Sequence, residues 1–326
     1  IEYVADLVAN ATPDEGCEIR VYEHTDNNNA WVAKPDSSCG LEVVSPPEKG
    51  WNGLKRVLKV VHALQVDPVI KSDRRCSVHI HVEISDLTKA QIASIVSWWV
   101  KCEPVIMDAM PMERKRNRYC QMVGMNNTFQ HDGNYTDDDI VRRVGDVKYY
   151  SLNAHQYVLG NRNTLEFRTM EGGGCKDAYL VKQWVRFIIH FVETAINSKR
   201  PLPYHDPKNE DEKKNLTPWT GLCWLDPEHV LTFLGFNNVP MEIPGVRPAK
   251  EYTLSNGMQQ TRNWFIARLM KNMSHHKEGG LRSFAQQQLH NIVQRYKEGG
   301  VVIDMKEHLT PQELLEDKLF SENYKI

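Results

Sequence analysis

Two short segments with alternating side chains place the strongest constraint on the fold of this chain. Residues 76–83 read Cys-Ser-Val-His-Ile-His-Val-Glu, and residues 164–168 read Thr-Leu-Glu-Phe-Arg. Because side chains two apart in a strand share a face, this alternation predicts two β-strands, each with one polar and one apolar face. The polar faces carry His79, His81 and Glu83 on the first strand and Thr164, Glu166 and Arg168 on the second.

The two histidines of the first strand have two interpretations. A solvent-facing strand accommodates two histidines that have no further role. Alternatively, His79 and His81 place two imidazoles side by side, as a metal or phosphate site requires. Zinc favours three His or Glu ligands in tetrahedral geometry, magnesium favours oxygen ligands, and manganese accepts both. The second interpretation predicts a polar sheet face that handles a cation and an anionic substrate.

Glu166 and Arg168 also admit two interpretations. On an exposed strand face they form an ion pair that contributes little stability. Just before the glycines at 172–174, the same pair suits a metal ligand beside an anion-binding arginine. Arginine grips a carboxylate or phosphate through two hydrogen bonds.

Further candidate residues lie on other predicted elements. Glu42 is either an edge-strand carboxylate or a functional one, whereas Asp36 fits a turn. The basic run after residue 110 is either a solvated helix end or, with Lys148 on the next strand, a phosphate-binding group. That run consists of Arg114, Lys115, Arg116 and Arg118. Cys120 and Cys175 have no base nearby in the sequence, so a nucleophilic role is disfavoured.

The predicted elements divide the chain into three parts. Residues 1–200 form an α+β domain in which short strands alternate with amphipathic helices. Strands are expected at 18–22, 31–34, 41–44, 76–84, 147–152 and 164–168, and helices at 53–66, 88–110, 137–145 and 177–197. Residues 201–225 are polar and contain proline, which is typical of a linker or mobile loop. Residues 226–326 are a mainly helical appendix, with helices expected at 227–235, 255–275, 281–298 and 310–318.

Taken in order, these segments resemble the family of putative amidoligases. That family belongs to the glutamine synthetase and glutamate–cysteine ligase superfamily of carboxylate–amine ligases. The matching segments are 31–36, 40–46, 76–83, 118–120, 148–153 and 163–168, followed by the helix that contains Trp184 and Phe187. The resemblance covers about residues 1–197, and the order and spacing of the motifs make it specific.

The resemblance implies a glutamine synthetase-like fold, in which a curved antiparallel sheet carries helices on its convex face. The concave face of such a sheet holds ATP with Mg²⁺ or Mn²⁺. Family members carry an N-terminal strand with a Glu-x-Glu pattern, so Glu2 is expected at the end of that strand. The implied metal ligands are Glu2, Glu42, His79 and Glu166. His81 and Arg168 are expected to face the phosphates or the carboxylate substrate.

The implied reaction is ATP- and metal-dependent formation of an amide bond between a carboxylate and an amine, through an acyl phosphate. The expected catalytic residues are Glu42, Glu166, Arg168 and His81. The residues expected around ATP are Arg114, Arg116, Arg118, Lys148, Arg168 and His81. Two alternatives stay open. One is a phosphotransferase resembling the guanidino kinases, and the other is a non-catalytic binding or structural protein that retains the ligase sheet.

Composition and resemblance together limit the partners and the compartment. The 326-residue chain has a net charge of −2, which does not indicate nucleic acid or an anionic membrane, although a modified nucleobase remains a possible substrate. No apolar run is long enough to span a membrane, and no signal peptide is visible. Seven irregularly spaced cysteines indicate reduced thiols and a cytoplasmic protein. The resemblance adds small-molecule or peptide carboxylates and amines as substrates, a homo-oligomer, and phage origin with the host cytoplasm as the location.

Overall fold

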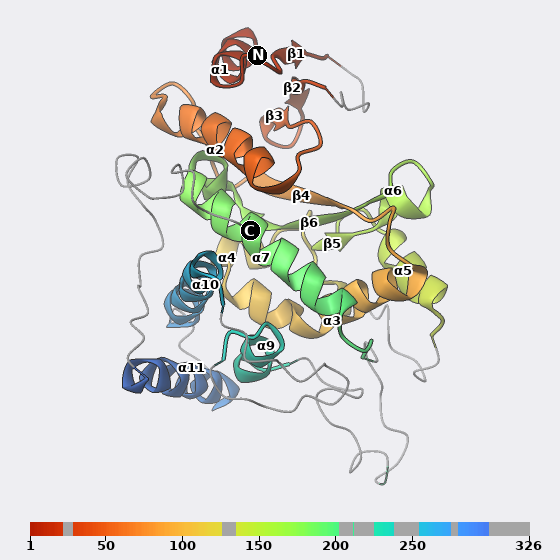
Figure 1. The fold of residues 1–326 in the computed structure, drawn as a ribbon, viewed down its shortest axis with the longest axis vertical. Coiled ribbons are helices and arrows are strands. Elements are labelled where there is room, and N and C mark those ends of the chain that lie inside the picture. Colours follow the sequence, from red (N-terminus) through yellow and green to blue (C-terminus); the bar gives the residue numbers. More distant parts are fainter. Residues whose placement is uncertain are drawn as a thin grey trace. The chain divides into compact units, whose positions relative to one another are not determined.

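The computed structural model describes residues 1–21, 29–125, 135–201, 211, 225–237, 254–274 and 280–299 (Figure 1). It has a mixed α+β fold, as the alternation of predicted strands and helices indicates. Its described residues fall into two compact units. Unit 1 contains Ile1–Val78 and Met170–Trp184, and unit 2 contains His79–Thr169 and the described residues of Val185–Met305.

Unit 1 is built from two helices and a three-stranded sheet. The helices are α1 (Glu2–Ala11) and α2 (Gly50–Val66), and the strands are β1 (Cys17–Ile19), β2 (Trp31–Asp36) and β3 (Gly40–Val44). In this sheet β2 lies in the middle, parallel to β1 and antiparallel to β3. Val4 and Val8 are one helical turn apart on α1 and are buried with Trp31 and Val60. Burial of this stripe explains why the N-terminal segment is helical.

Position 172 in unit 1 requires a glycine because two backbone segments approach each other closely there. Gly172 begins the short 3₁₀ helix η2 (Gly172–Lys176). A Cβ atom at Gly172 would lie 2.1 Å from the carbonyl oxygen of Asp73 and 2.7 Å from that of Cys76. No side chain fits against two backbone carbonyls at these distances, so glycine is required there for a close approach of two chain segments.

The sheet that carries both alternating segments has the order β4-β6-β5. Its strands are β4 (Ser77–Glu83), β5 (Leu152–Asn153) and β6 (Thr164–Glu171). β5 and β6 are antiparallel, with Asn153 opposite Glu166 and Leu152 opposite Phe167. Leu165 and Phe167 are completely buried. The apolar face of β6 therefore points into the core, and Glu166 and Arg168 lie on the other face.

Helices surround this sheet in unit 2. The larger ones are α3 (Lys89–Asp108), α5 (Asp137–Gly145), α7 (Ala178–Ile196), α9 (Pro227–Phe233), α10 (Asn256–Ser274) and α11 (Gly280–Glu298). Short helical turns are α4 (Met112–Lys115), η1 (Val123–Met125) and α6 (His155–Val158). None of the helices that the structure describes combines the length and the apolar character needed to cross a bilayer.

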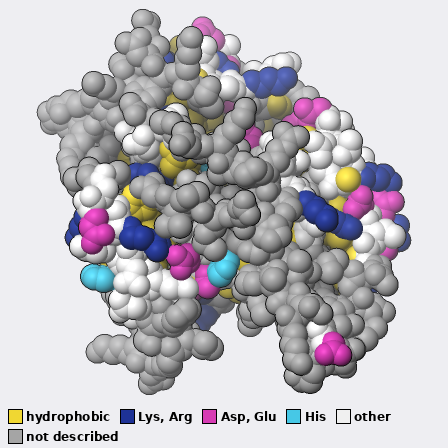
Figure 2. All heavy atoms as spheres, turned by 60° about the horizontal axis from the view of Figure 1, so that its bottom comes forward, with side chains coloured by type: hydrophobic (Ala, Val, Ile, Leu, Met, Phe, Trp, Pro, Cys, Tyr) yellow, Lys and Arg dark blue, Asp and Glu magenta, His cyan; other side chains and the backbone are white. Residues whose placement is uncertain are grey.

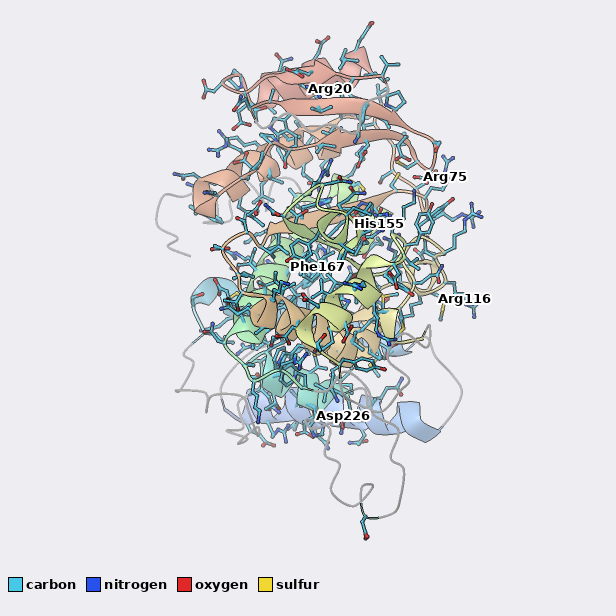
Figure 3. All side chains as sticks on the ribbon, turned by 90° about the vertical axis from the view of Figure 1, so that its right-hand side faces the viewer. Arg20, Arg75, Arg116, His155, Phe167 and Asp226 are labelled. Carbon is cyan, nitrogen blue, oxygen red and sulfur yellow. The ribbon has the colours of Figure 1, made fainter. Side chains whose placement is uncertain are left out.

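α3 and α7 cover the apolar face of β6. Thr88 caps α3 through a capping box with Gln91. The ring of Trp99 on α3 meets Phe167 of β6 and Phe191 of α7 edge to face, with ring centroids 4.9 and 5.3 Å apart. Phe167 thus lies in the interior between these elements (Figure 3). The aromatic core fixes the orientation of β6 and keeps its polar face away from α3.

The helices after residue 225 also pack on α3. Trp98 of α3 stacks on Phe233 of α9 with ring centroids 4.1 Å apart. On α10, Arg268 Nε and Asn272 Nδ2 donate to the carbonyl oxygen of Ala109 over 2.9 and 2.8 Å. These bonds satisfy a carbonyl at the C-terminus of α3. The structure therefore groups α9 and α10 with α3, while the predicted linker at 201–225 lies almost entirely outside the described residues, as does the predicted helix at 310–318.

Two local predictions were wrong. The strand expected at 147–152 is reduced to β5, because Tyr150 forms only an isolated bridge with Gln121. Glu2 begins α1 and does not end a strand. The single curved antiparallel sheet is not confirmed, since the described strands pair into two sheets and β1 is parallel to β2.

Candidate active site

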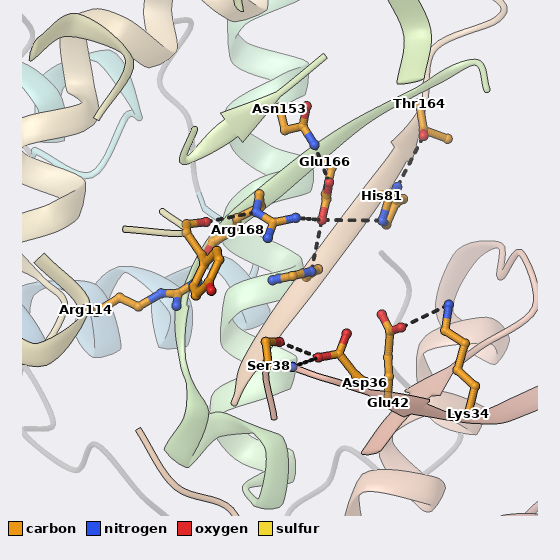
Figure 4. A network of polar contacts seen from close by, with 12 residues as sticks. Lys34, Asp36, Ser38, Glu42, His81, Arg114, Asn153, Thr164, Glu166 and Arg168 are labelled. Atoms are coloured by element: carbon orange, nitrogen blue, oxygen red, sulfur yellow. Dashed lines mark hydrogen bonds and ion pairs between the residues drawn. The ribbon is translucent and has the colours of Figure 1, made fainter. Parts of the chain in front are cut away.

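The structure brings the polar side chains of β4 and β6 together around Glu166. His79 Nδ1 lies 2.9 Å from Glu166 Oε1, and His81 Nε2 lies 3.8 Å from the same oxygen. Arg168 donates from Nη1 to Oε1 over 2.5 Å, and Asn153 donates from Nδ2 to Oε2 over 2.6 Å (Figure 4). We call these five residues the Glu166 cluster.

The Glu166 carboxylate is buried yet charged. It is 8 % exposed, and burial alone raises the pKa of a carboxyl group. The hydrogen bond from His79 and the electrostatic effects of His79, Arg168 and His81 outweigh burial and hold the pKa of Glu166 well below its usual range. Glu166 is therefore a fixed negative charge between three basic side chains at neutral pH.

Arg168 is held in place by the backbone around it. Its Nε donates to the carbonyl oxygen of Tyr119 over 3.2 Å, and its backbone N–H donates to the carbonyl oxygen of Ser151 over 2.8 Å. Within the described part of the chain, its Nη2 makes no hydrogen bond. The guanidinium is thus oriented by Glu166 and Tyr119 and retains donors for an anionic group.

His81 is the most exposed member of the cluster. Its side chain is 38 % exposed, compared with 25 % for His79. Its Nδ1 lies 3.3 Å from the hydroxyl oxygen of Thr164 at the start of β6. This contact orients the ring and leaves its other nitrogen facing Glu166 at 3.8 Å. Such an imidazole is accessible to a substrate from solvent.

Arg114 does not have the position expected for an ATP ligand. It is only 3 % exposed. Its Nε donates to the carbonyl oxygen of Thr169 over 3.2 Å, and its Nη2 donates to that of Arg168. Since its guanidinium is directed at the backbone of β6, the structure assigns Arg114 a role in supporting the strand that carries Arg168.

Three other predicted ATP ligands are exposed. Arg116, Arg118 and Lys148 all lie on the surface of unit 2. Arg118 and Lys148 each lie over a neighbouring tyrosine ring, and Lys148 belongs to a turn and not to the predicted strand. A role in binding ATP stays a prediction for these three residues.

Glu42 and Glu2 belong to unit 1. Glu42 on β3 forms an ion pair with Lys34 on the neighbouring strand β2, with 3.0 Å between Nζ and Oε2 (Figure 4). Asp36 is the last residue of β2, and its Oδ1 accepts the backbone N–H of Ser38 in the following turn over 2.7 Å. The roles of Glu2 and Glu42 as metal ligands, and of Glu42 in catalysis, stay predictions.

The described residues do not form a ready metal site. Histidine and glutamate are suitable donors for Mn²⁺. However, no three or more His, Cys, Asp or Glu side chains in the described part of the chain are arranged to hold an ion. Oε1 of Glu166 already contacts the cationic side chain of Arg168 at 2.5 Å and His79 at 2.9 Å. A cation at this oxygen would have to displace the guanidinium.

Asn153 and Glu103 are polar residues that sequence reasoning missed. The signal for Asn153 lies in the pairing of β5 with β6, which places it opposite Glu166. Glu103 is a charged residue inside the apolar stretch of α3 and is completely buried. It accepts hydrogen bonds from the backbone N–H groups of Val123 and Gly124 over 2.9 and 3.1 Å and from the hydroxyl of Ser151. Glu103 thus connects α3 to the residue whose carbonyl binds the backbone of Arg168.

Glu103 should make the stability of the protein depend on pH near neutrality. Burial raises the pKa of Glu103 to about 7, although hydrogen bonds from Ser151, Val123 and Gly124 lower it. The folded state binds the proton of Glu103 more tightly than the unfolded state does. The stabilisation that results is fully present below the unfolded-state pKa, and it is lost as pH rises through the folded-state pKa. The free energy of unfolding of the wild type, relative to Glu103→Gln, should fall by roughly 1 kcal/mol per pH unit between about pH 5 and 7.

Urea unfolding at several pH values measures this difference. A constant difference between the wild type and Glu103→Gln from pH 5 to 7 would show that Glu103 stays charged in the folded state. Asp138 offers a matched control, because its exposed carboxylate pairs only with exposed Lys89. Asp138→Asn should therefore follow the pH profile of the wild type over this range.

Cys120 is poorly suited to act as a nucleophile. It is 1 % exposed, and burial raises the pKa of its thiol to about 11. At neutral pH almost no thiolate is present, and the thiolate is the nucleophilic form. The structure thus agrees with the sequence-based argument against a covalent cysteine intermediate at this position.

Comparison with known proteins gives a family match to the region of the chain that contains the Glu166 cluster. A family model described as "putative amidoligase enzyme" matches residues 19–192, which is more than half of the chain. No curated protein and no solved structure gives a significant match. The matched region includes β4 and β6 and therefore the whole Glu166 cluster.

Proposed function

Because this chain belongs to the putative amidoligase family, we propose that it is an ATP- and divalent-metal-dependent ligase that joins a carboxylate to an amine. The family membership supports a ligase-like enzyme. The observation that carries the finer proposal is the Glu166 cluster, in which Arg168 is oriented by a buried carboxylate and a backbone carbonyl. A glutamine synthetase-like curved sheet remains part of the proposal.

The reaction begins at the anion-binding side of the cluster. A carboxylate is a poor electrophile, so its oxygen first attacks the terminal phosphorus of ATP. A P–O bond forms, the P–O bond to ADP breaks, and an acyl phosphate results. The free donors of Arg168 face the charge that develops on the transferred phosphoryl group. Glu166 keeps the guanidinium in position, so that little reorganisation is needed during the reaction.

The second step requires a group that accepts a proton. The amine nitrogen attacks the carbonyl carbon of the acyl phosphate, the amide C–N bond forms, and inorganic phosphate leaves. The amine loses a proton, and the exposed imidazole of His81 is the member of the cluster best placed to accept it. A divalent cation, when bound, neutralises the phosphates of ATP. His79 and Glu166 supply ligand types that suit it, and Glu42 and Glu2 remain further candidates.

A hydroxylamine assay tests the proposed chemistry without knowledge of the natural amine. Hydroxylamine attacks an acyl phosphate and gives a hydroxamate. With ATP, MnCl₂ and a panel of amino-acid and peptide carboxylates, we expect hydroxamate together with ADP and phosphate in equal amounts. ADP release should require both the carboxylate and hydroxylamine, and mass spectrometry should find an oxygen atom transferred from ¹⁸O-labelled carboxylate to phosphate.

The same assay separates the alternative functions. A stable phosphorylated product without hydroxamate would identify a phosphotransferase. Absence of ATP and Mn²⁺ binding in calorimetry would indicate a non-catalytic protein. Small-molecule or peptide substrates, a homo-oligomer and a location in the cytoplasm, or in the host cytoplasm for a phage protein, complete the proposal.

A further inference from the structure

Two tyrosines from separate segments lie together on the surface of unit 2. The rings of Tyr119 and Tyr149 meet edge to face, with centroids 5.2 Å apart and planes inclined by 72°. The two segments are joined by backbone hydrogen bonds. The N–H of Gln121 donates to the carbonyl of Tyr149, and the N–H of Ser151 donates to the carbonyl of Gln121, both over 2.8 Å. The backbone therefore positions the two rings.

Each ring carries an exposed cation. The guanidinium carbon of Arg118 lies 4.7 Å from the ring centroid of Tyr119, and the ammonium nitrogen of Lys148 lies 5.1 Å from that of Tyr149. Arg118 also donates from Nη2 to the hydroxyl of Tyr119 over 2.6 Å. Within the described residues, neither cation forms a salt bridge, nor does the exposed Arg116 two residues before Arg118. We call Arg118, Tyr119, Lys148 and Tyr149 the tyrosine platform.

The tyrosine platform adjoins the Glu166 cluster. The carbonyl oxygen of Tyr119 accepts the hydrogen bond from Nε of Arg168. The half-buried Tyr119 thus also orients the proposed anion-binding arginine through its backbone. Because this contact uses the backbone of Tyr119, its side chain can be changed while the contact with Arg168 is retained.

A platform of aromatic rings and free cations matches the chemistry of a nucleotide. A base stacks on an aromatic side chain with a contribution of about 1–3 kcal/mol, and arginine and lysine bind phosphate oxygens. A polynucleotide would require an extended basic surface. The net charge of the chain is −2, and on the one face drawn in Figure 2 the coloured acidic and basic side chains are interspersed. These observations favour a single nucleotide.

We propose that the tyrosine platform binds the adenine base of ATP, with the phosphates extending towards Arg168. This inference rests on the proposed function and adds the subsite that recognises the base. The exposed side chain of Arg118 moves off the ring of Tyr119 to admit the base and then stacks on its other side. Lys148 supplies a second positive charge beside the nucleotide.

Titration calorimetry of the full chain with ATP and with inorganic tripolyphosphate tests the platform. The double variant Tyr119→Leu/Tyr149→Leu should bind ATP about 10- to 100-fold more weakly, because stacking is lost. Its affinity for tripolyphosphate should stay unchanged. The variant Tyr119→Phe/Tyr149→Phe retains both rings and should keep its affinity for ATP within a few-fold of the wild type. If the phenylalanine variant keeps its affinity for ATP, the weaker binding of the leucine variant is due to loss of stacking and not to damage to the fold.

Tyr135 provides the matched control. Its ring carries Arg143 at 4.5 Å from the centroid, which is the same kind of pair elsewhere in unit 2. Tyr135→Leu should bind ATP as the wild type does. Equal losses for ATP and tripolyphosphate in the double leucine variant, or no loss, would overturn the platform. Tighter binding of a single-stranded oligonucleotide than of ATP to the wild type would also overturn it.

The hydroxylamine assay distinguishes failure of the platform from failure of the proposed function. Hydroxamate formation with an unchanged KM for ATP in the double leucine variant would reject the platform and leave the ligase function standing. The expected ATP-selective binding without any hydroxamate would support the platform and reject the ligase function. A wild-type chain that binds no ATP would overturn both.

Discussion

Replacing Glu166 with glutamine is expected to lower ATP-dependent turnover by about 10³-fold or more. The carboxylate is the common partner of His79, Arg168 and Asn153, and glutamine removes its charge with almost no change in shape. Arg168 then loses the ion pair that orients it, and misplacement of a preorganised donor commonly costs 10²- to 10³-fold. Loss of the charged contact to His79 adds to this effect. Initial rates of ADP release at saturating ATP measure the change.

Glu113→Gln is a suitable control because Glu113 is exposed in the first turn of α4. It should retain wild-type turnover. Thermal unfolding should show that Glu166→Gln remains folded, so that the loss of turnover reflects the site. Turnover within a few-fold of the wild type would mean that Glu166 has no part in the reaction.

The same substitution changes the response to acid. The folded-state pKa of Glu166 lies below its ordinary value, so its charge stabilises the fold above the unfolded pKa. That contribution is lost as pH falls from about 4 towards the folded pKa. Below about pH 4, the wild type should therefore lose more stability than Glu166→Gln does.

The alternation of side chains was sufficient to predict the strands of the candidate site. His79 and His81 share a face of β4, and Glu166 and Arg168 share a face of β6, as the period of two requires. Amphipathic spacing likewise located α2, α3 and α7 within a few residues. These features depend on local geometry, which the sequence contains directly.

The features that the sequence did not reveal depend on which segments pair. Asn153 reaches Glu166 only because β5 lies beside β6 in one register. Of the predicted strand at 147–152, Tyr150 pairs with Gln121 only in an isolated bridge, and ladder pairing with β6 begins at Leu152. Strand pairing is set by contacts far apart in the chain, so local patterns do not determine it.

The basic run after residue 110 is a second case in which the sequence alone did not determine the role of each residue. Its four cationic residues looked equivalent as candidates for binding phosphate. In the structure Arg114 is buried against β6, Lys115 pairs with Asp108 at 2.7 Å, and Arg116 and Arg118 are exposed. Burial separates them because α4 is a short turn that directs one side chain inward. Composition cannot distinguish a structural arginine from a ligand-binding one.

Arg114→Met is therefore expected to act through stability and not through affinity for ATP. It removes hydrogen bonds to the carbonyl oxygens of Thr169 and Arg168. Methionine fills much of the same volume but leaves these buried acceptors unpaired. Hydrogen bonds from charged groups contribute about 1.5–3 kcal/mol each, so the free energy of unfolding should fall by roughly 3 kcal/mol. Chemical denaturation at neutral pH measures this loss.

Arg116→Met separates the two roles within the same run. Arg116 is exposed, so its replacement should change the free energy of unfolding by less than about 0.5 kcal/mol. If Arg114→Met were as stable as Arg116→Met and instead bound tripolyphosphate more weakly, Arg114 would be a phosphate ligand after all. The buried contacts favour the opposite result. Arg114 binds the carbonyl oxygens of Thr169 and Arg168, so the position of the proposed anion-binding arginine depends on a buried cation that is directed at the backbone.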